Sequence, residues 1–147
     1  MSETREDDIV HLLGGPRTIV GRSEPSERDV RERIRAGLPY RSFETVRERL
    51  QLSVPEAAGV LGVPLRTLAR RRIEKKFASD ESDRLYRLAR IAAQAVRVLG
   101  SDEKAAAWLR RPNRSLGGET PLEVLDTDIG TRETEEALGR LEHGIVG

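Results

Sequence analysis

The 147-residue sequence contains no cysteine, which excludes disulfide bonds, thiolate nucleophiles, zinc fingers and iron–sulfur clusters together. Its two histidines, His11 and His143, stand near opposite ends, without the close spacing that metal ligands need. The aromatic residues are one Trp, two Tyr and two Phe, too few for a platform that stacks single-stranded nucleic acid. We therefore expect neither a metal ion nor another cofactor.

Targeting signals and long apolar runs are also missing. The first residues, Met1 to Asp8, are acidic and polar, unlike the basic start of a secretory signal. No run of about 18 apolar residues occurs, so we expect no membrane span. These absences predict a soluble, cytoplasmic protein.

Charged residues make up 35% of the chain and cancel to a net charge of +1, but the cancellation hides a strong polarity. Residues 64–76 hold six basic residues against one acidic residue, a net charge of +5. Residues 119–147 hold two basic residues against eight acidic ones, a net charge of −6. Such asymmetry indicates two regions with different partners, one of them a polyanion. The alternative is that each region is simply a solvated face.

The hydrophobic pattern predicts an all-α fold, because no alternating apolar run is bounded by a hairpin turn. Capping residues, glycines and prolines set the expected helix ends. We expect helices over residues 1–13, from Ser23 to Gly37, from a cap at Ser42, over 53–61 and 64–73, over 79–99 with its cap at Ser79, and after the caps Ser101, Thr120 and Thr131.

Residues 53–73 carry the clearest local motif. Ser53 is placed to cap a helix with Pro55 in its first turn, where a missing N–H costs little. Gly62 ends this helix, and Pro64 opens a second one. Two helices joined by a short turn that contains glycine are typical of a helix-turn-helix.

The second helix of this motif divides into two faces when projected at about 100° per residue. We expect one face to pack against the domain, and it consists of Leu65, Leu68, Ala69 and Ile73. The other face supplies the candidate DNA contacts, which are Arg66, Thr67, Arg70 and Arg71. A helix in this position enters the major groove in DNA-binding proteins. One feature argues against DNA contact, because many such helices hold a large apolar anchor near position 71.

Residues 79–99 predict a long helix whose apolar face is wider than a surface helix needs. We favour a core covered on two sides, and the alternative is a core plus an oligomer interface. At the other end of the chain, Gly144 is expected to stop the last helix, and apolar residues 145–147 follow it. Such a tail is expected to dock, either on its own core or on another protein.

Two segments of the sequence match one family pattern. The first is the helix-turn-helix at residues 52–68, which many repressors share. The second and more specific one contains Trp108-Leu109, Pro112-Asn113, Leu116-Gly117-Gly118, Pro121-Leu122, Leu125 and Leu138-Gly139-Arg140-Leu141-Glu142-His143-Gly144. With these segments the chain resembles the Xre/MbcA/ParS-type antitoxins that are paired with RES-domain toxins, over roughly residues 38–147.

This resemblance implies a Cro/CI-like helix-turn-helix core followed by a C-terminal helical toxin-binding segment. It divides the chain into an N-terminal helical segment of unknown role (1–37), a helix-turn-helix domain with the long central helix (38–100) and a toxin-binding domain (101–147). The C-terminal segment would bind and sterically inhibit a RES-domain toxin that consumes NAD. The helix-turn-helix would bind operator double-stranded DNA and repress the protein's own operon, as a homodimer or in a larger assembly with toxin.

The resemblance also implies which residues reach the toxin. The candidates lie on the last helix and the tail, and they are Glu135, Leu138, Arg140, Leu141, Glu142, Gly144, Ile145 and Val146. A segment of net charge −6 would complement the basic pocket that binds the pyrophosphate of NAD. The alternative is a stand-alone regulator whose C-terminal domain serves dimerisation or sensing. We do not expect an enzyme, because the sequence shows no acid–base pair, nucleophile motif or phosphate-cradling glycine loop.

Overall fold

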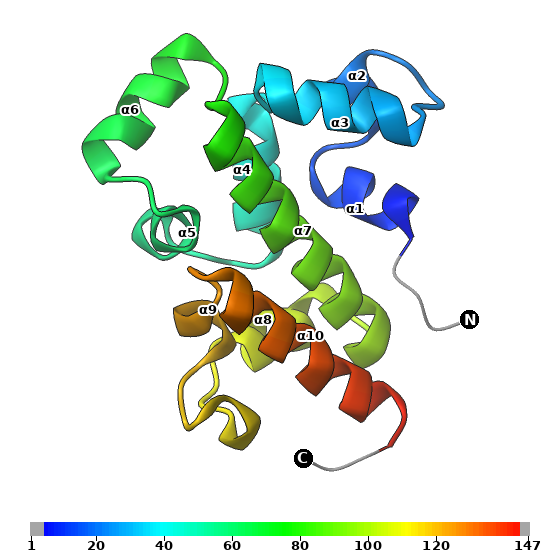
Figure 1. The fold of residues 1–147 in the computed structure, drawn as a ribbon, viewed down its shortest axis with the longest axis vertical. Coiled ribbons are helices and arrows are strands. Elements are labelled where there is room, and N and C mark those ends of the chain that lie inside the picture. Colours follow the sequence, from blue (N-terminus) through cyan, green and yellow to red (C-terminus); the bar gives the residue numbers. More distant parts are fainter. Residues whose placement is uncertain (1–4, 145–147) are drawn as a thin grey trace.

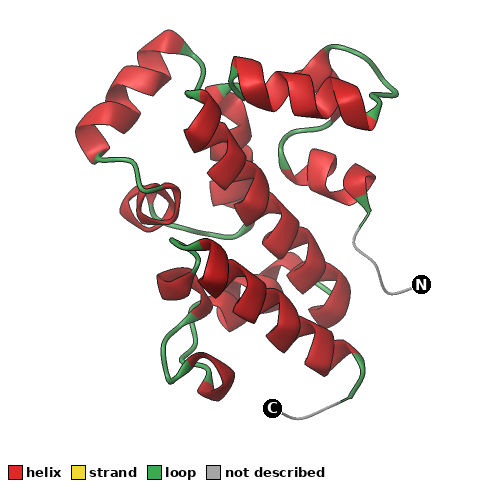
Figure 2. Ribbon diagram, viewed as in Figure 1, coloured by secondary structure: helices red, strands yellow, loops and turns green. Residues whose placement is uncertain are grey.

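The computed structural model describes residues 5–144, and within this range it contains only helices, turns and one isolated backbone bridge (Figures 1 and 2). This confirms the predicted all-α fold. In the same range no helix has both the length and the apolar character needed to cross a bilayer. The helices are α1 (Glu6–Leu12), α2 (Pro16–Val20), α3 (Glu27–Ala36), α4 (Tyr40–Arg49), α5 (Val54–Leu61), α6 (Leu65–Glu74), α7 (Ser79–Leu99), α8 (Asp102–Leu109), the 3-10 helix η1 (Arg114–Leu116), α9 (Pro121–Val124) and α10 (Asp128–Glu142).

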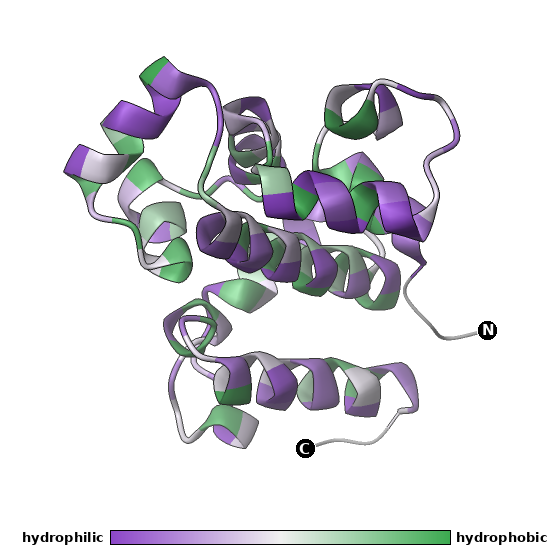
Figure 3. Ribbon diagram, turned by 45° about the horizontal axis from the view of Figure 1, so that its top comes forward, coloured by the Kyte–Doolittle hydropathy of each residue, from purple (hydrophilic) through white to green (hydrophobic). Residues whose placement is uncertain are grey.

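The long helix α7 is the centre of the molecule. In Figure 3 it lies between α3 above and α10 below, and it also contacts α1, α5 and α8. Leu85, Ile91 and Ala93 point in different directions around this helix, and all three are buried. The wide apolar face predicted from the sequence is therefore covered by helices of the same chain, which confirms the interpretation as a core.

Helices α2 and α3 differ from the sequence prediction. An extra helix, α2, begins at Pro16, because proline fits the first helical position even after the Gly14-Gly15 break. Helix α3 begins later than predicted, at the N-cap Ser26. There the Ser26 hydroxyl accepts from the Asp29 amide (3.1 Å) and the Asp29 carboxylate accepts from the Ser26 amide (2.9 Å).

The predicted cap at Ser42 is wrong. Helix α4 begins two residues earlier, at Tyr40, and Ser42 is buried inside it. The reason is long-range pairing, since the Tyr40 amide donates to the carbonyl of Lys75 (3.0 Å) and the Phe77 amide donates to that of Leu38 (2.9 Å). This isolated bridge fixes the start of α4 against the segment that follows α6.

The start of the last helix was also predicted wrongly. Helix α10 begins at Asp128 with Thr127 as its N-cap, which accepts from the Gly130 amide (3.0 Å). The predicted cap, Thr131, lies within the first turns and donates its hydroxyl to the carbonyl of Thr127 (2.9 Å). A side chain at Gly130 would lie 1.8 Å from the carbonyl oxygen of Val124, so glycine permits α9 and α10 to approach closely.

The helix-turn-helix itself has the predicted form. Ser53 caps α5, its hydroxyl accepting from the Glu56 amide (3.1 Å) while Glu56 accepts from the Ser53 amide (2.7 Å). Gly62 adopts the left-handed conformation (φ 65°) that ends the helix, and Val63 is buried beneath the turn. This geometry sets α6 at an angle to α5 and carries it away from the rest of the molecule (Figure 1).

Candidate functional site

Helix α6 presents most of its length to solvent. Arg66 and Arg70 are exposed, and Thr67 is partly buried. Arg66 and Arg70 lie on the side of α6 that faces away from the domain, and Thr67 lies next to that side. Helix α6 therefore offers two cationic side chains to a ligand. Arg72 is exposed as well, and sequence analysis counted it in the basic run without naming it as a candidate.

The predicted apolar packing face of α6 is mostly wrong. Only Leu68 is buried, whereas Leu65 is 54% exposed and Ile73 is 81% exposed. The buried side of α6 is turned by about 100° around the helix axis from the predicted side, because Leu68 and Arg71 make the contacts with the domain. The outward side of α6 consequently mixes apolar and cationic residues, and the ribbon of α6 in Figure 3 carries both hydrophobic and hydrophilic colours.

Arg71 has a different place from the other candidate DNA contacts. Its guanidinium donates to both carboxylate oxygens of Glu81 at the start of α7 (2.7 and 3.0 Å) and to Glu74 (3.0 Å). The hydrogen bonds with Glu81 and Glu74 raise the pKa of Arg71. Many helices of this kind are anchored by a large apolar residue near this position, and here the ion pair of Arg71 takes that role. It also keeps the Arg71 side chain on the inner side of α6.

Helix α10 is held along α7 by arginines. Arg90 contacts the carboxylate of Glu135 (3.1 Å), Arg97 is paired with Glu142, and Gln94 donates to the backbone carbonyl of Glu135 (3.2 Å). A further pair joins Arg87 of α7 to Asp128 at the start of α10 (3.5 Å between Nη1 and Oδ1). Three of the eight acidic residues of 119–147 are therefore paired within the chain, and the other five are exposed.

The structure separates the candidate toxin contacts into three groups. Leu138 is fully buried in the core, where it packs within the chain, and its contact with a toxin stays a prediction. Glu135 and Glu142 are occupied by the α7 arginines. The remaining side chains and backbone that a partner can reach are Arg140, Leu141 and Gly144, with Leu141 43% exposed. Ile145 and Val146, together with the predicted docking of the tail, lie outside the described residues.

Sequence analysis missed one exposed apolar residue on α10, Ile129, which is 65% exposed. Ile129 was not predicted because the helix was expected to begin at Thr131, which leaves residue 129 outside it. With the cap at Thr127, residues 129, 132 and 136 share the outward face of α10. We name this face together with the end of the helix the α10 surface; it comprises Ile129, Arg132, Glu136, Arg140, Leu141 and Gly144.

Two ion pairs tie the helix-turn-helix to the C-terminal region. Arg110, which follows α8, contacts Glu56 of α5 (2.8 Å), and its hydrogen bonds lower the pKa of that carboxyl. Arg49 of α4 holds Asp102 of α8 with two hydrogen bonds (2.9 and 3.0 Å). The two candidate surfaces therefore belong to one packed unit.

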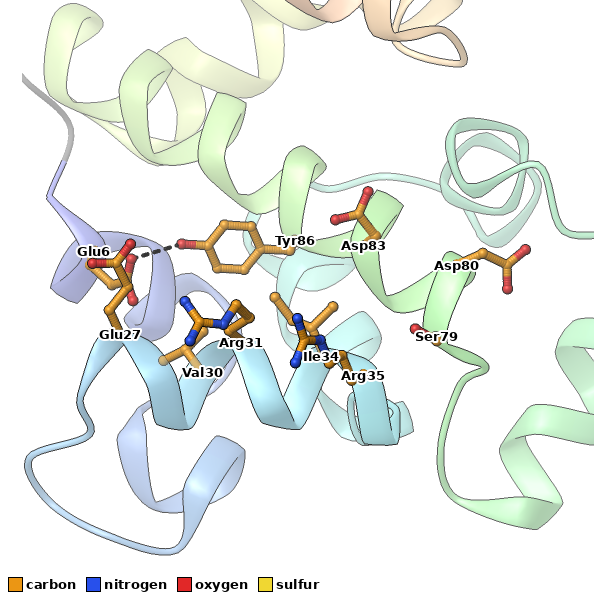
Figure 4. Close-up of a pocket in the computed structure, with 10 residues that line it drawn as sticks. All are labelled: Glu6, Glu27, Val30, Arg31, Ile34, Arg35, Ser79, Asp80, Asp83 and Tyr86. Atoms are coloured by element: carbon orange, nitrogen blue, oxygen red, sulfur yellow. Dashed lines mark hydrogen bonds between the residues drawn. The ribbon is translucent and has the colours of Figure 1, made fainter.

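The N-terminal segment forms the wall of a pocket of about 630 Å³ between α1, α3 and α7 (Figure 4). Within it the hydroxyl of Tyr86 donates to the carboxylate of Glu6 (3.2 Å), and burial raises the pKa of Tyr86. Val30 and Ile34 supply its apolar floor. These contacts give residues 5–37 a structural role in covering α7.

Across residues 5–144, no group of three or more His, Asp or Glu side chains is placed to hold a metal ion. Exposed apolar and charged residues instead gather on α6 and α10.

Comparison with known proteins finds two families, each matching a different part of the chain. The family described as the antitoxin Xre-like helix-turn-helix domain matches residues 29–90. The family described as the antitoxin Xre/MbcA/ParS C-terminal toxin-binding domain matches residues 94–144. The first match covers α6, and the second covers the α10 surface.

Individual relatives extend over most of the chain. Antitoxin Xre of Photorhabdus laumondii is 36% identical over 115 residues, which are 77% of this chain and 78% of the relative. Antitoxin Xre of Pseudomonas putida is 37% identical over 121 residues, 81% of this chain and 74% of the relative. A Prs ADP-ribosylating antitoxin of a Sphingobium species is 30% identical over 77 residues, 46% of this chain and 48% of the relative. The chain thus belongs to the Xre family of antitoxins, with an Xre-like helix-turn-helix and a C-terminal toxin-binding domain.

Proposed function

We propose that this antitoxin sterically inhibits a RES-domain, NAD-consuming toxin through its C-terminal region and represses its own operon through α6. It acts by binding, without chemistry of its own, in the cytoplasm where operator DNA is located. The observation that carries the proposal is the presence, in one packed unit, of a basic exposed α6 and a toxin-binding domain with an exposed end. A homodimer, alone or assembled with toxin, would match the two-fold symmetry of an operator.

The choice of toxin rests on two supports. The sequence of the C-terminal segment resembles the antitoxins of RES toxins. The Sphingobium relative is by name an ADP-ribosylating antitoxin, and ADP-ribosylation takes its ADP-ribose from NAD. Both point to a toxin that uses NAD.

The α10 surface is the proposed toxin contact. Leu141 and Ile129 are exposed apolar residues of the kind that fill pockets on a partner, and Arg140 is the cation next to Leu141. Glu135 and Glu142 act indirectly, because they hold α10 in place on α7. This assigns recognition to shape and apolar contact more than to the acidic charge counted in the sequence.

The proposed DNA contacts are Arg66, Thr67 and Arg70. Arginine can bond guanine edges in the major groove or neutralise phosphates, and both roles need an exposed side chain. Arg71 is left out of this set, since its guanidinium is occupied by Glu81 and Glu74. We assign it the positioning of α6.

Two exposed leucines, one on each surface, allow a single experiment to test the division of labour. Leu141→Asp should abolish co-purification with the RES protein encoded beside the antitoxin and abolish rescue from it, while operator binding persists. Leu65→Asp should do the reverse. A variant ending at Gly144 tests the contribution of residues 145–147 without removing any described residue.

Several results would contradict the proposal. Full rescue by both Leu141→Asp and the variant ending at Gly144 would remove the C-terminal region as the inhibitor. If the protein bound its operator but the adjacent gene encoded no toxin, the result would instead indicate the stand-alone regulator.

A second experiment addresses α6 directly. Arg66→Ala and Arg70→Ala should each weaken operator binding and lower the salt-dependence slope by about one per lost phosphate contact. Arg114→Ala, an exposed arginine of the C-terminal region, serves as the matched control. Unchanged binding in both α6 variants would show that α6 is not the DNA-contacting helix.

A further inference from the structure

The outward face of α6 carries a regular apolar row. Leu65, Ala69 and Ile73 follow one another at intervals of four residues, and all three are exposed. Exposing a large aliphatic side chain such as Ile73 gains nothing for a free monomer, and single exposed apolar residues are common. Three in register on a helix that also carries the candidate DNA contacts indicate a surface built to meet an apolar ligand group.

This row borders a shallow hollow of about 660 Å³ between α6 and the starts of α4 and α5. The starts of α5 and α6 are the parts of a helix-turn-helix that approach the duplex. Carbon atoms supply most of the hollow's lining, which is formed by Tyr40, Val54, Leu65, Leu68, Ala69, Arg72 and Ile73.

Charge decides what occupies this face. Arg66, Arg70 and Arg72 stand among the apolar residues, and Lys75 and Lys76 follow directly, all of them exposed. A second copy docked on the same face would bring these cations against their own counterparts, which is unfavourable without counter-ions. A nucleic-acid duplex supplies the opposite charge along its whole length.

The major groove also supplies the apolar partner. Thymine presents its 5-methyl group there, and aliphatic side chains contact it, while arginine pairs with guanine. Leu65 and Ile73 are separated by eight residues, or about 12 Å along the helix axis. That distance corresponds to between three and four base pairs at about 3.4 Å each.

We propose that Leu65, Ala69 and Ile73 read thymine methyl groups in the operator, interleaved with the guanine and phosphate contacts of Arg66 and Arg70. The operator half-site then contains A·T pairs at the positions facing these three residues. This inference rests on the proposed DNA-binding function and adds the class of base that the apolar row selects.

Replacing thymine by uracil removes only the methyl group and therefore tests the proposal directly. The probe is the duplex upstream of the protein's own operon, limited to the region it protects, with every thymine in that region replaced by deoxyuridine. Wild-type protein should bind this duplex about fourfold more weakly for each methyl group contacted. Ile73→Ala should bind the thymine duplex more weakly than wild type and lose part of this discrimination, and Leu65→Ala/Ile73→Ala should lose nearly all of it.

Arg66→Ala is the matched control, because it should lose affinity for both duplexes while keeping the thymine-to-uracil ratio of wild type. A second control duplex carries deoxyuridine only outside the protected region and should bind like the thymine duplex. Equal affinity of wild-type protein for the thymine and uracil duplexes would overturn the proposal while leaving operator binding intact.

Failure of the underlying function has a different signature. No binding to either duplex at low salt would contradict DNA binding itself. If Leu65→Ala/Ile73→Ala converted a dimer to a monomer in sedimentation, the apolar row would be an interface between two copies, which would also overturn the assignment to thymine.

Discussion

Helices α6 and α10 are both amphipathic, and each lies in one of the two most strongly charged stretches of the sequence. In α10 the acidic residues Asp128, Glu135 and Glu142 meet arginines of α7, and Ala137 and Leu138 are buried, while Ile129 and Leu141 are exposed. In α6 one arginine is used for anchoring, and the other arginines and most of the apolar residues face solvent. The local charge of a sequence therefore does not equal the charge of the surface it forms.

The difference also separates stability from binding. Residues of α10 hold the molecule together and leave a few positions free, whereas α6 contributes little to the core and leaves most of its surface free. Substitutions of the same chemical type should accordingly have different consequences in the two helices.

Leu138→Ala should produce the largest effect. It removes a fully buried side chain between α10 and α7, so the free energy of unfolding should fall by about 2–5 kcal/mol. Leu65→Ala, the matched substitution at an exposed position in α6, should change it by less than about 0.5 kcal/mol. Urea denaturation followed by circular dichroism measures both, and equal losses would contradict the contrast.

Glu81→Gln should have the second-largest effect. The free energy of unfolding should fall by about 1–3 kcal/mol near pH 7, because the substitution weakens the bidentate contact that anchors α6. Burial raises the pKa of Glu81, but the Arg71 guanidinium and the Ala78 amide outweigh it, so the pKa lies below its usual 4.5. A carboxylate with a depressed folded-state pKa stabilises the fold above the unfolded pKa and loses that contribution as the pH falls.

The difference between wild type and Glu81→Gln should therefore be constant at neutral pH and shrink once the pH falls below about 4.5. Glu74→Gln is the control, since Glu74 bonds the same arginine from an exposed position. If the stability difference between wild type and Glu81→Gln instead grew as the pH fell, the pKa of Glu81 would not be lowered in the folded protein.

Glu135→Gln should have a smaller effect, at most about 1 kcal/mol, because both partners of the Arg90 pair are about one-third exposed. The effect should decline as salt is raised, since exposed pairs are screened. Thermal unfolding at low and high salt would detect it. A larger loss that is independent of salt would mean that Glu135 acts through packing instead.

Ile73→Ser should have the smallest effect on stability, within about 0.5 kcal/mol of zero, because the side chain is almost fully exposed. It should still weaken operator binding. A large loss of stability would place Ile73 in an interface and remove the distinction between α6 and α10.

Much of the fold could be predicted from local signals. The capping box at Ser53, the left-handed glycine at 62 and the apolar periodicity of 79–99 act over a few residues, so the sequence displays them directly. The errors occur where local packing overrides another capping signal and, above all, where distant segments intervene. The start of α4 depends on pairing with residues 75–77, and the start of α10 depends on the close approach of Val124 to Gly130.

The candidate site was harder to predict for the same reason. Periodicity identifies an amphipathic helix but not which side meets the domain, and in α6 that side is set by the ion pair of Arg71 with Glu81. Likewise, the acidic residues of α10 look free in the sequence because their arginines lie some 40 residues earlier.

Helix α7 has a consequence for attempts to divide the protein. Helices α1 and α3 pack against α7, and α10 is paired with the α7 arginines at 87, 90 and 97. Cutting the chain after Gly100 would therefore remove the contacts that hold α10 in place. A fragment of residues 101–147 would expose leucines that now meet α7 and should be unstructured by itself. Heating the intact chain should then melt both ends in one concerted transition.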